Sequence, residues 1–154
     1  MNKVIAGVFG FILSLYLVVP IYNNFQLSRF SRQLWDLEFP QGIVVLEEDK
    51  ENGKLNGNGN SMDYFACVLV KTEKPQDELE EFLESKKFHR ARDHEKECRD
   101  KEVVKVESDN LQSKYLEHET ITFESLSDET EFQGYYALII YDGGYDSSFD
   151  IRGH

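Results

Sequence analysis

A run of nineteen uncharged residues near the start of the chain is the feature that most limits its fold. Residues 4–22, VIAGVFGFILSLYLVVPIY, contain no Asp, Glu, Lys or Arg. A helix rises about 1.5 Å per residue, so this run can nearly cross a hydrocarbon core of about 30 Å. Tyr16 and Tyr22 suit a membrane interface, and Pro20 is tolerated near the end of such a helix. The run therefore predicts a transmembrane helix.

A cleaved signal peptide is the alternative interpretation of the same run. Its apolar stretch would usually be about 7 to 15 residues long and would be followed by a small-x-small cleavage site. The chain continues into PIYNNFQLSRF, which has no such site, so an uncleaved signal-anchor is favoured. Lys3 precedes the run while Arg29 and Arg32 follow it, so the positive-inside rule favours neither orientation clearly. The short basic start favours a cytoplasmic N-terminus, with the following domain outside the cell.

The rest of the chain is strongly acidic. The sequence has 17 Lys and Arg against 29 Asp and Glu, a net charge of −12, and Lys3 is the one charged residue before residue 26. Such a surface repels nucleic-acid phosphates and anionic headgroups, so we expect no nucleic-acid partner and a domain that stands off the membrane. A basic protein partner or a cation is compatible with this charge.

Patterned segments after the anchor predict a small α+β domain. Five of them are apolar or alternate apolar with polar residues, which is typical of strands. They are residues 43–48, 63–71, 103–108, 120–126 and 134–142. A helix is predicted around DELEEFL, with Pro75 at its first position. The expected order is β-β-α-β-β-β, giving a mostly antiparallel sheet with one main helix on one face. The predicted boundaries are a signal-anchor in residues 1–25, a stalk in 26–41, the domain in 42–142 and a flexible tail in 143–154.

Two connecting segments are harder to assign. In the stalk, Leu27, Phe30, Leu34 and Leu37 have helical spacing. That helix could continue the anchor, lie near the membrane interface or pack on the domain. Residues 89–102, HRARDHEKECRDKE, are almost entirely polar and predict a solvated loop or a charged helical extension.

The two cysteines have no metal-binding or redox spacing. Cys67 lies in an apolar run and is expected to be buried, whereas Cys98 lies among charges and is expected to be exposed. A disulfide between them stays open for an extracytoplasmic domain.

An Asn-Gly-rich loop before the second strand is the main candidate site. Asn-Gly pairs favour positive φ, and one pair suffices for a hairpin turn, so three pairs indicate a longer loop. Successive N–H groups in such a loop can form a nest for an anion, although no P-loop cation follows. A family-specific hairpin loop without a ligand is the favoured interpretation, and a ligand or partner contact is the alternative. The candidate ligand or partner residues are Asn56, Gly57, Asn58, Gly59, Asn60 and Tyr64.

The segments GNGNSMDYFACVLVK, DELEEFL and YYALIIYD together resemble a family of short signal-anchored proteins of Gram-positive bacteria. The shared features are a GNGNGM-x-YF loop-strand, a helix rich in Glu and Leu, and a late Tyr-Tyr strand, over roughly residues 40 to 142. Ser61 stands where the family pattern has a third glycine. The resemblance implies the anchor and the domain, and it carries no assigned activity, so it supplies no catalytic residues.

Other constellations give weaker indications. Asp142, Asp146 and Asp150 recur every fourth residue in YDGGYDSSFD and could bind calcium. The EF-hand spacing is missing, so a solvated acidic tail is the favoured interpretation. No G-x-S-x-G motif or activated nucleophile is present, so catalytic residues, cofactors and a resident metal are not predicted.

The sequence therefore predicts a single-pass, membrane-anchored interaction or binding module of unknown specificity. It is held in the membrane by residues 4–22, and its acidic domain meets a protein or envelope partner outside the cell. A domain that senses a cation or a small ligand is the alternative, followed by a hydrolase.

Overall fold

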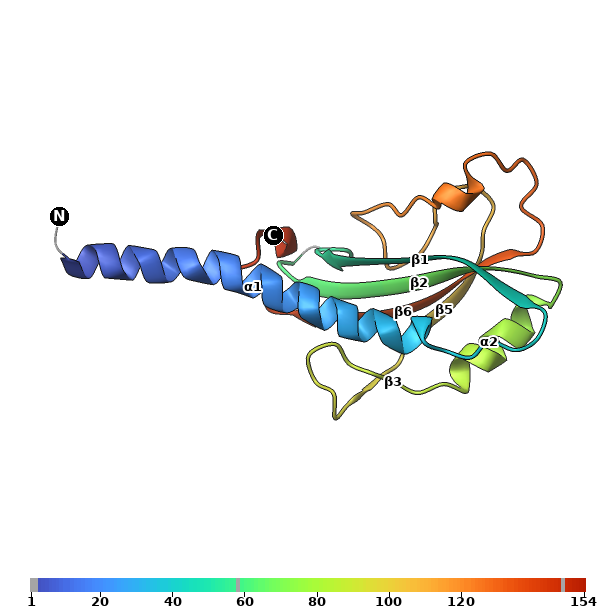
Figure 1. Cartoon of the computed structure of the whole chain (residues 1–154), viewed down its shortest axis with the longest axis horizontal. Coiled ribbons are helices and arrows are strands. Elements are labelled where there is room, and N and C mark those ends of the chain that lie inside the picture. The colour runs from blue at the N-terminus through green and yellow to red at the C-terminus, as the bar shows by residue number, and fades with distance from the viewer. Residues whose placement is uncertain (1–2, 58, 148) are drawn as a thin grey trace.

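A long helix runs onto one face of a four-stranded antiparallel sheet in the computed structural model, which describes residues 3–57, 59–147 and 149–154 (Figure 1). The sheet order is β1-β2-β6-β5, and β3 and β4 form a separate small hairpin. This confirms the predicted α+β fold. The elements are α1 (Lys3–Trp35), β1 (Ile43–Gly53), β2 (Met62–Thr72), α2 (Gln76–Glu84), β3 (Phe88–His89), β4 (Glu97–Cys98), β5 (Asp100–Lys105), η1 (Glu124–Leu126), β6 (Tyr135–Tyr145) and η2 (Ile151–Gly153).

Helix α1 has two parts with different surroundings. Its first part is apolar and exposed, and by length and composition it could cross a membrane. Its second part lies on the sheet and buries Leu27, Phe30 and Leu34, three of the four stalk residues with helical spacing. The fourth, Leu37, follows the end of the helix and packs against the same core while only partly buried. Trp35 at the helix end donates its indole N–H to the carbonyl oxygen of Cys67 at 3.2 Å. The predicted stalk is thus a continuation of the anchor helix and supplies part of the domain core.

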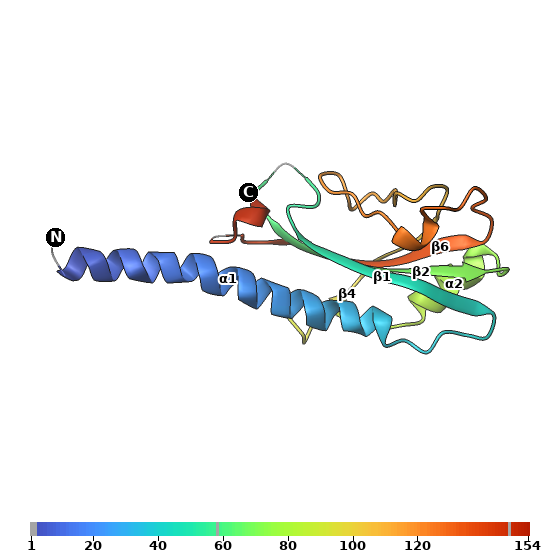
Figure 2. The same cartoon turned by 45° about the horizontal axis from the view of Figure 1, so that its top comes forward.

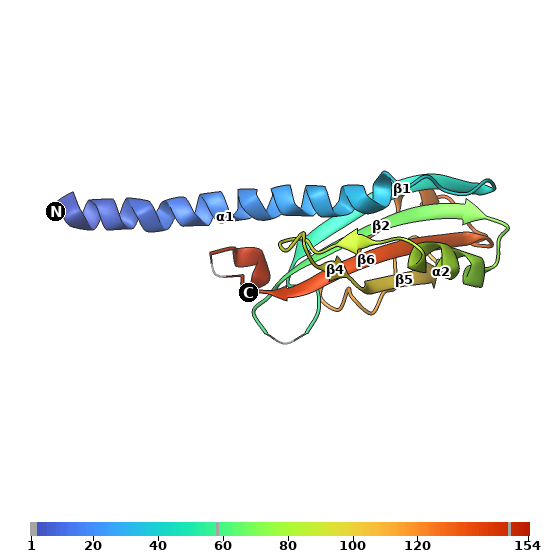
Figure 3. The same ribbon diagram turned by 90° about the horizontal axis from the view of Figure 1, so that it is seen from below.

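The sheet separates two hydrophobic cores. Strand β2 is buried along almost its whole length, with Ala66 and Val68 facing α1 while Cys67 and Leu69 face the other side. The helices and the β3–β4 hairpin cover the first face (Figure 3). The second face is covered by the segment between β5 and β6, drawn in orange in Figure 2, whose Leu111, Phe123 and Leu126 are buried. A nearly continuous apolar run in β2 therefore reflects burial on both faces.

Three predictions about local structure are wrong. Residues 120–126 form an isolated bridge and the short helix η1 instead of a strand. The charged segment 89–102 forms most of the β3–β4 hairpin and the start of β5, and its Cys98 is buried. The expected flexible tail is structured where it is described, since β6 extends to Tyr145 and η2 follows it. Each error arises where polar side chains form specific tertiary contacts that local composition does not reveal.

The cysteines lie on opposite faces of the sheet. Cys67 belongs to the core under the β5–β6 segment, whereas Cys98 belongs to the core under α1. Both are free and buried, so the expected burial of Cys67 is confirmed and the expected exposure of Cys98 is wrong. Because the sheet stands between the two thiols, this fold does not permit a disulfide between them.

A matched pair of phenylalanines on α1 tests whether the second part of the helix belongs to the core. Phe30→Ala should lower the free energy of unfolding by about 3 to 5 kcal/mol, because the Phe30 side chain is fully buried. Phe25→Ala should change it by less than about 0.5 kcal/mol, because Phe25 is exposed. Thermal unfolding of the full chain in detergent, followed by the fluorescence of the single tryptophan, measures both. Equal effects of the two substitutions would contradict this packing.

Candidate functional site

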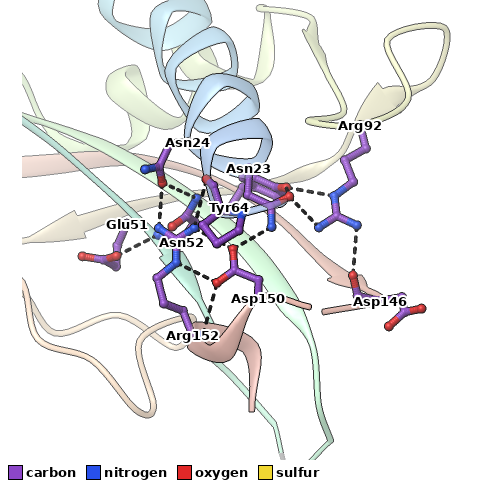
Figure 4. A network of polar contacts seen from close by, with 10 residues as sticks. Asn23, Asn24, Glu51, Asn52, Tyr64, Arg92, Asp146, Asp150 and Arg152 are labelled. Carbon is purple, nitrogen blue, oxygen red and sulfur yellow. Dashed lines mark hydrogen bonds and ion pairs between the residues drawn. The ribbon is translucent and has the colours of Figure 1, made fainter. Parts of the chain in front are cut away.

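Buried polar side chains close the junction where α1 leaves the sheet (Figure 4). Asn23 on α1 and Tyr64 on β2 are both fully buried. Tyr64 Oη donates to Asn23 Oδ1 at 2.9 Å. Arg92, in the β3–β4 hairpin loop, donates from Nε to Tyr64 Oη at 2.8 Å and from Nη2 to Asn23 Oδ1 at 2.9 Å. Since buried polar groups cost free energy unless they are hydrogen-bonded, these bonds fix the helix, the sheet and the hairpin relative to one another.

The C-terminal tail (residues 149–154) joins this network. Asn23 Nδ2 and Arg152 Nη2 donate to Asp150 Oδ2 at 2.8 and 2.6 Å. Arg152 also donates to Asn24 Oδ1 at 2.6 Å and to the carbonyl oxygen of Pro20 at 3.3 Å. Burial alone would raise the pKa of Asp150, but the hydrogen bonds from Arg152 and Asn23 outweigh it and lower that pKa below its usual value. The tail is thereby fastened to α1.

A second cluster fastens the hairpin to β6. Asp142, which is buried, accepts from Arg90 Nε at 2.9 Å and from the Ala91 N–H at 2.7 Å, and Tyr145 Oη also donates to it. Burial raises the pKa of Tyr145, and the adjacent carboxylate of Asp142 raises it further. The guanidinium groups of Arg90 and Arg92 lie 4.9 and 5.0 Å from the centre of the Tyr145 ring. These contacts give the arginines of a very polar segment a structural role.

The three candidate calcium ligands are not brought together as a ligand set. Asp142 is paired with Arg90, and Asp150 is paired with Arg152. Within the described parts of the chain, no group of three or more His, Cys, Asp or Glu residues is placed to hold a metal ion. The geometry therefore assigns Asp142 and Asp150 to ion pairs, and it gives the cation-sensing alternative no observation of its own.

The buried carboxylate of Asp63 organises the Asn-Gly loop. Its Oδ2 accepts from the N–H groups of Leu55 and Asn56, each at 3.2 Å, and from Ser61 Oγ at 3.3 Å. Its Oδ1 accepts from the N–H of Gly144 at 2.9 Å. An internal carboxylate therefore already occupies the position where a nest of backbone N–H groups would hold an anion.

The structure separates the predicted loop residues. Gly57, Gly59 and Asn60 are exposed, and Asn56 is half-buried. Gly57 donates its N–H to Glu117 Oε2 at 3.1 Å and has the positive φ expected of an Asn-Gly pair. Asn58 lies outside the described residues. Tyr64 is fully buried in the junction network, so the prediction that it contacts a partner is wrong. A ligand for the exposed part of the loop stays a prediction.

No pattern in the sequence indicated an exposed apolar edge on β1. Val44, Val45 and Leu46 are exposed, and 58% of the surface of Val44 is accessible to solvent. Strand β1 lies at the border of the sheet and pairs with β2 alone among the described strands. The pairing shifts between Val45 and Glu47, so Leu46 lies at an irregularity. The run IVVL predicts an ordinary strand. That this strand lies at the edge follows only from the order of strands in the sheet.

This apolar edge lies at the end of the domain that is farthest from the anchor. Strand β1 runs opposite to α1, because Asn52 and Lys50 near its end reach Asn24 and Ser28, at 3.5 and 3.0 Å. Its beginning therefore lies beyond the C-terminal end of α1 (Figure 1). An open hollow of about 910 Å³ lies beside it and is lined by mixed charges. Its lining includes Lys71, Glu73, Lys74, Glu129, Glu131 and Tyr136.

Comparison of the chain with protein families, curated proteins and solved structures finds no match. The resemblance to signal-anchored proteins of Gram-positive bacteria therefore stays a prediction.

Replacing Asp63 tests its role in holding the Asn-Gly loop. Asp63→Asn should lower the free energy of unfolding by about 1 to 3 kcal/mol, because it removes a charged acceptor shared by buried donors. Amide hydrogen exchange at Leu55, Asn56 and Gly144 should accelerate. Asp128→Asn removes the same charge from an exposed position and should leave both measurements unchanged. Unaltered exchange in Asp63→Asn would rule out this role.

Proposed function

We propose that the chain is a single-pass, membrane-anchored interaction module. Its distal apolar edge, Val44 to Leu46, pairs with an extended, basic segment of a protein partner outside the cell. An apolar helix long enough to cross a membrane supports the anchor. Lys3, which precedes the apolar run, supports the orientation.

The observation that carries the proposal is the position of the exposed apolar side chains. Outside α1, the large hydrophobic side chains exposed by the described residues are Val44, Val45, Leu46 and Ile151. Three of the four are adjacent on one edge strand. An unpaired strand edge offers backbone N–H and C=O groups to another strand, and apolar side chains there favour strand addition.

The remainder of β1 supports the choice of the pairing site and of the charge of the partner. In the half of β1 nearer the membrane, the N–H groups of Lys50 and Asn52 donate to the carboxylates of Asp49 and Glu51. These two N–H groups are therefore already hydrogen-bonded and are not open to a partner strand. The strand carries Glu47, Glu48, Asp49 and Glu51 against Lys50. These carboxylates follow the apolar half directly. They therefore favour lysine or arginine in a segment that pairs with the apolar half.

Pairing of β1 with a second copy of itself does not suit a shared membrane. Antiparallel pairing of two β1 strands would need a two-fold axis perpendicular to the strands. Since β1 runs opposite to α1, that axis would direct the two anchors into opposite directions. Two copies anchored in one membrane cannot satisfy this arrangement, so a different protein is the better partner.

Binding of a model peptide tests the edge. A short peptide of alternating Lys and Val, added to the full chain in lipid nanodiscs, should shift the amide resonances of residues 43–48. The signals of the opposite edge strand β5 should not move. Val44→Lys should weaken binding by about tenfold or more, equivalent to about 1.4 kcal/mol, because an edge lysine repels the peptide.

The controls for this titration use charge and position. Thr122→Lys adds the same charge at an exposed residue outside β1 and should bind like the wild type. A peptide of alternating Glu and Val should not bind. Shifts confined to the Asn-Gly loop, or equal binding of the acidic peptide, would contradict the proposal.

Labelling of an introduced thiol tests the side of the membrane. Val44→Cys should react with a membrane-impermeant maleimide in intact cells, since residue 44 is exposed. The wild-type chain should not react, because both native cysteines are buried and burial raises the pKa of the Cys98 thiol to about 12. Labelling of Val44→Cys that requires cell lysis would place the domain in the cytoplasm.

A further inference from the structure

We propose that the C-terminal tail is a membrane-contact element, which inserts Phe149 and Ile151 into the lipid interface beside α1. The inference rests on the proposed anchor and extends it, because it assigns a second contact with the same bilayer. A free tail was expected from the sequence, and an acidic domain was expected to stand off the membrane.

Exposure of Ile151 is the first observation. Ile151 exposes 73% of its surface, about as much as the 71% of Phe9 in the apolar part of α1. It belongs to η2, and nearby parts of α1 expose Ile21, Tyr22 and Phe25. An isoleucine this exposed is unfavourable in water and favourable in lipid.

The tail is held where Ile151 can meet that lipid. The residues on either side of it, Asp150 and Arg152, bond to Asn23 and Asn24 on α1 (Figure 4). Gly153 packs so closely that a Cβ there would lie 2.5 Å from the carbonyl oxygen of Ser61. The exposure of Ile151 is therefore a feature of a docked segment.

Contacts along α1 give the level of the tail relative to the membrane. Arg152 reaches the carbonyl oxygen of Pro20, and the ring of Phe149 lies 5.5 Å from the ring of Tyr16, in an edge-to-face arrangement. Tyr16 precedes Pro20 by four residues, which is about 6 Å along a helix. Phe149 therefore lies deeper along the anchor than the arginine does, an order that matches aromatic side chains below headgroup-level arginines.

Pro20 gives a second reason to place this turn of α1 at the interface. Proline has no N–H, so the carbonyl of Tyr16 lacks its usual donor four residues later. An unsatisfied carbonyl is costly in hydrocarbon and is hydrated at the interface. The helix turn that contacts Phe149 and Arg152 is thus the turn best suited to the boundary between lipid and water.

The charge of the tail is compatible with lipid at this point. Asp150 and Arg152 form an ion pair at 2.6 Å and neutralise each other. The chain as a whole has a net charge of −12, so zwitterionic headgroups suit it better than anionic ones. A phosphatidylcholine bilayer is therefore the occupant that we assign to this surface.

Depth measurements on the full chain test the assignment. Single cysteines are introduced as Ile151→Cys, Val44→Cys and Phe9→Cys, and each is labelled with an environment-sensitive fluorophore. The native cysteines are buried and stay unlabelled. The proteins are placed in two sets of phosphatidylcholine vesicles. One set contains lipids with a quencher near the headgroup, which reports on residues 44 and 151, and the other contains lipids with a quencher along the acyl chain, which reports on residue 9. Ile151→Cys should be quenched at least about threefold more strongly than Val44→Cys, which is exposed at the far end of the domain.

The three probes separate the two proposals. Strong quenching at residues 9 and 151 with none at 44 supports the membrane-contact element. Quenching at residue 9 without quenching at 151 overturns it and leaves the anchor intact; a protein partner or a second copy would then have to cover Ile151. Absence of quenching at residue 9 overturns the anchor and the membrane-contact element together. Ile151→Ser with the label at Phe149→Cys gives a second measurement, in which the label should become shallower.

Discussion

One helix carries both an apolar part that is long enough to span a membrane and a part of the domain core, and the rest of the structure depends on this sharing. The first part of α1 is exposed and apolar, while the second part buries Leu27, Phe30 and Leu34 against the sheet. No linker separates the two parts, since the helix is continuous from Lys3 to Trp35. A domain attached in this way cannot rotate freely about the apolar part of α1, so its two ends keep fixed distances from that part of the helix.

The junction network makes that attachment specific. Packing of leucine and phenylalanine side chains would tolerate small shifts of the helix along the sheet, because hydrophobic contact is not directional. Asn23, Tyr64 and Asp150 do not tolerate such shifts, because each would leave a buried polar group without its partner. Arg92 and Arg152 complete the network from the hairpin and from the tail. The helix, the sheet, the hairpin and the C-terminus are thereby fixed together.

The two apolar surfaces outside α1 lie at opposite ends of this rigid unit. Val44 to Leu46 lie beyond the end of α1 that is remote from the anchor, and Ile151 lies beside the turn where the exposed part of the helix begins. The proposed protein partner would approach the distal surface, and the proposed lipid contact would form at the proximal one. Strand β1 spans the distance between them, with its acidic half towards the apolar part of α1.

Local patterns were enough to predict the long apolar helix, the α+β class, the first two strands, the second helix and the last strand. Each of these rests on hydrophobic periodicity, which the chain carries in its own sequence. The stalk residues Leu27, Phe30 and Leu34 were also recognisable by their spacing, although the surface that they pack against was not. Local composition failed where polar residues find distant partners. Arg90 and Arg92 look solvated in sequence, yet they pair with Asp142 and Tyr64.

The sequence by itself determined that the chain carries an apolar helix able to span a membrane and a small acidic α+β domain, because length, charge and periodicity are local properties. The tertiary structure alone decided that Tyr64 is buried, that Asp63 fills the Asn-Gly loop, that β1 is an edge and that the tail docks on α1. Those outcomes depend on which strands become neighbours and on which buried polar groups find partners. Both are set by long-range packing and not by any single segment.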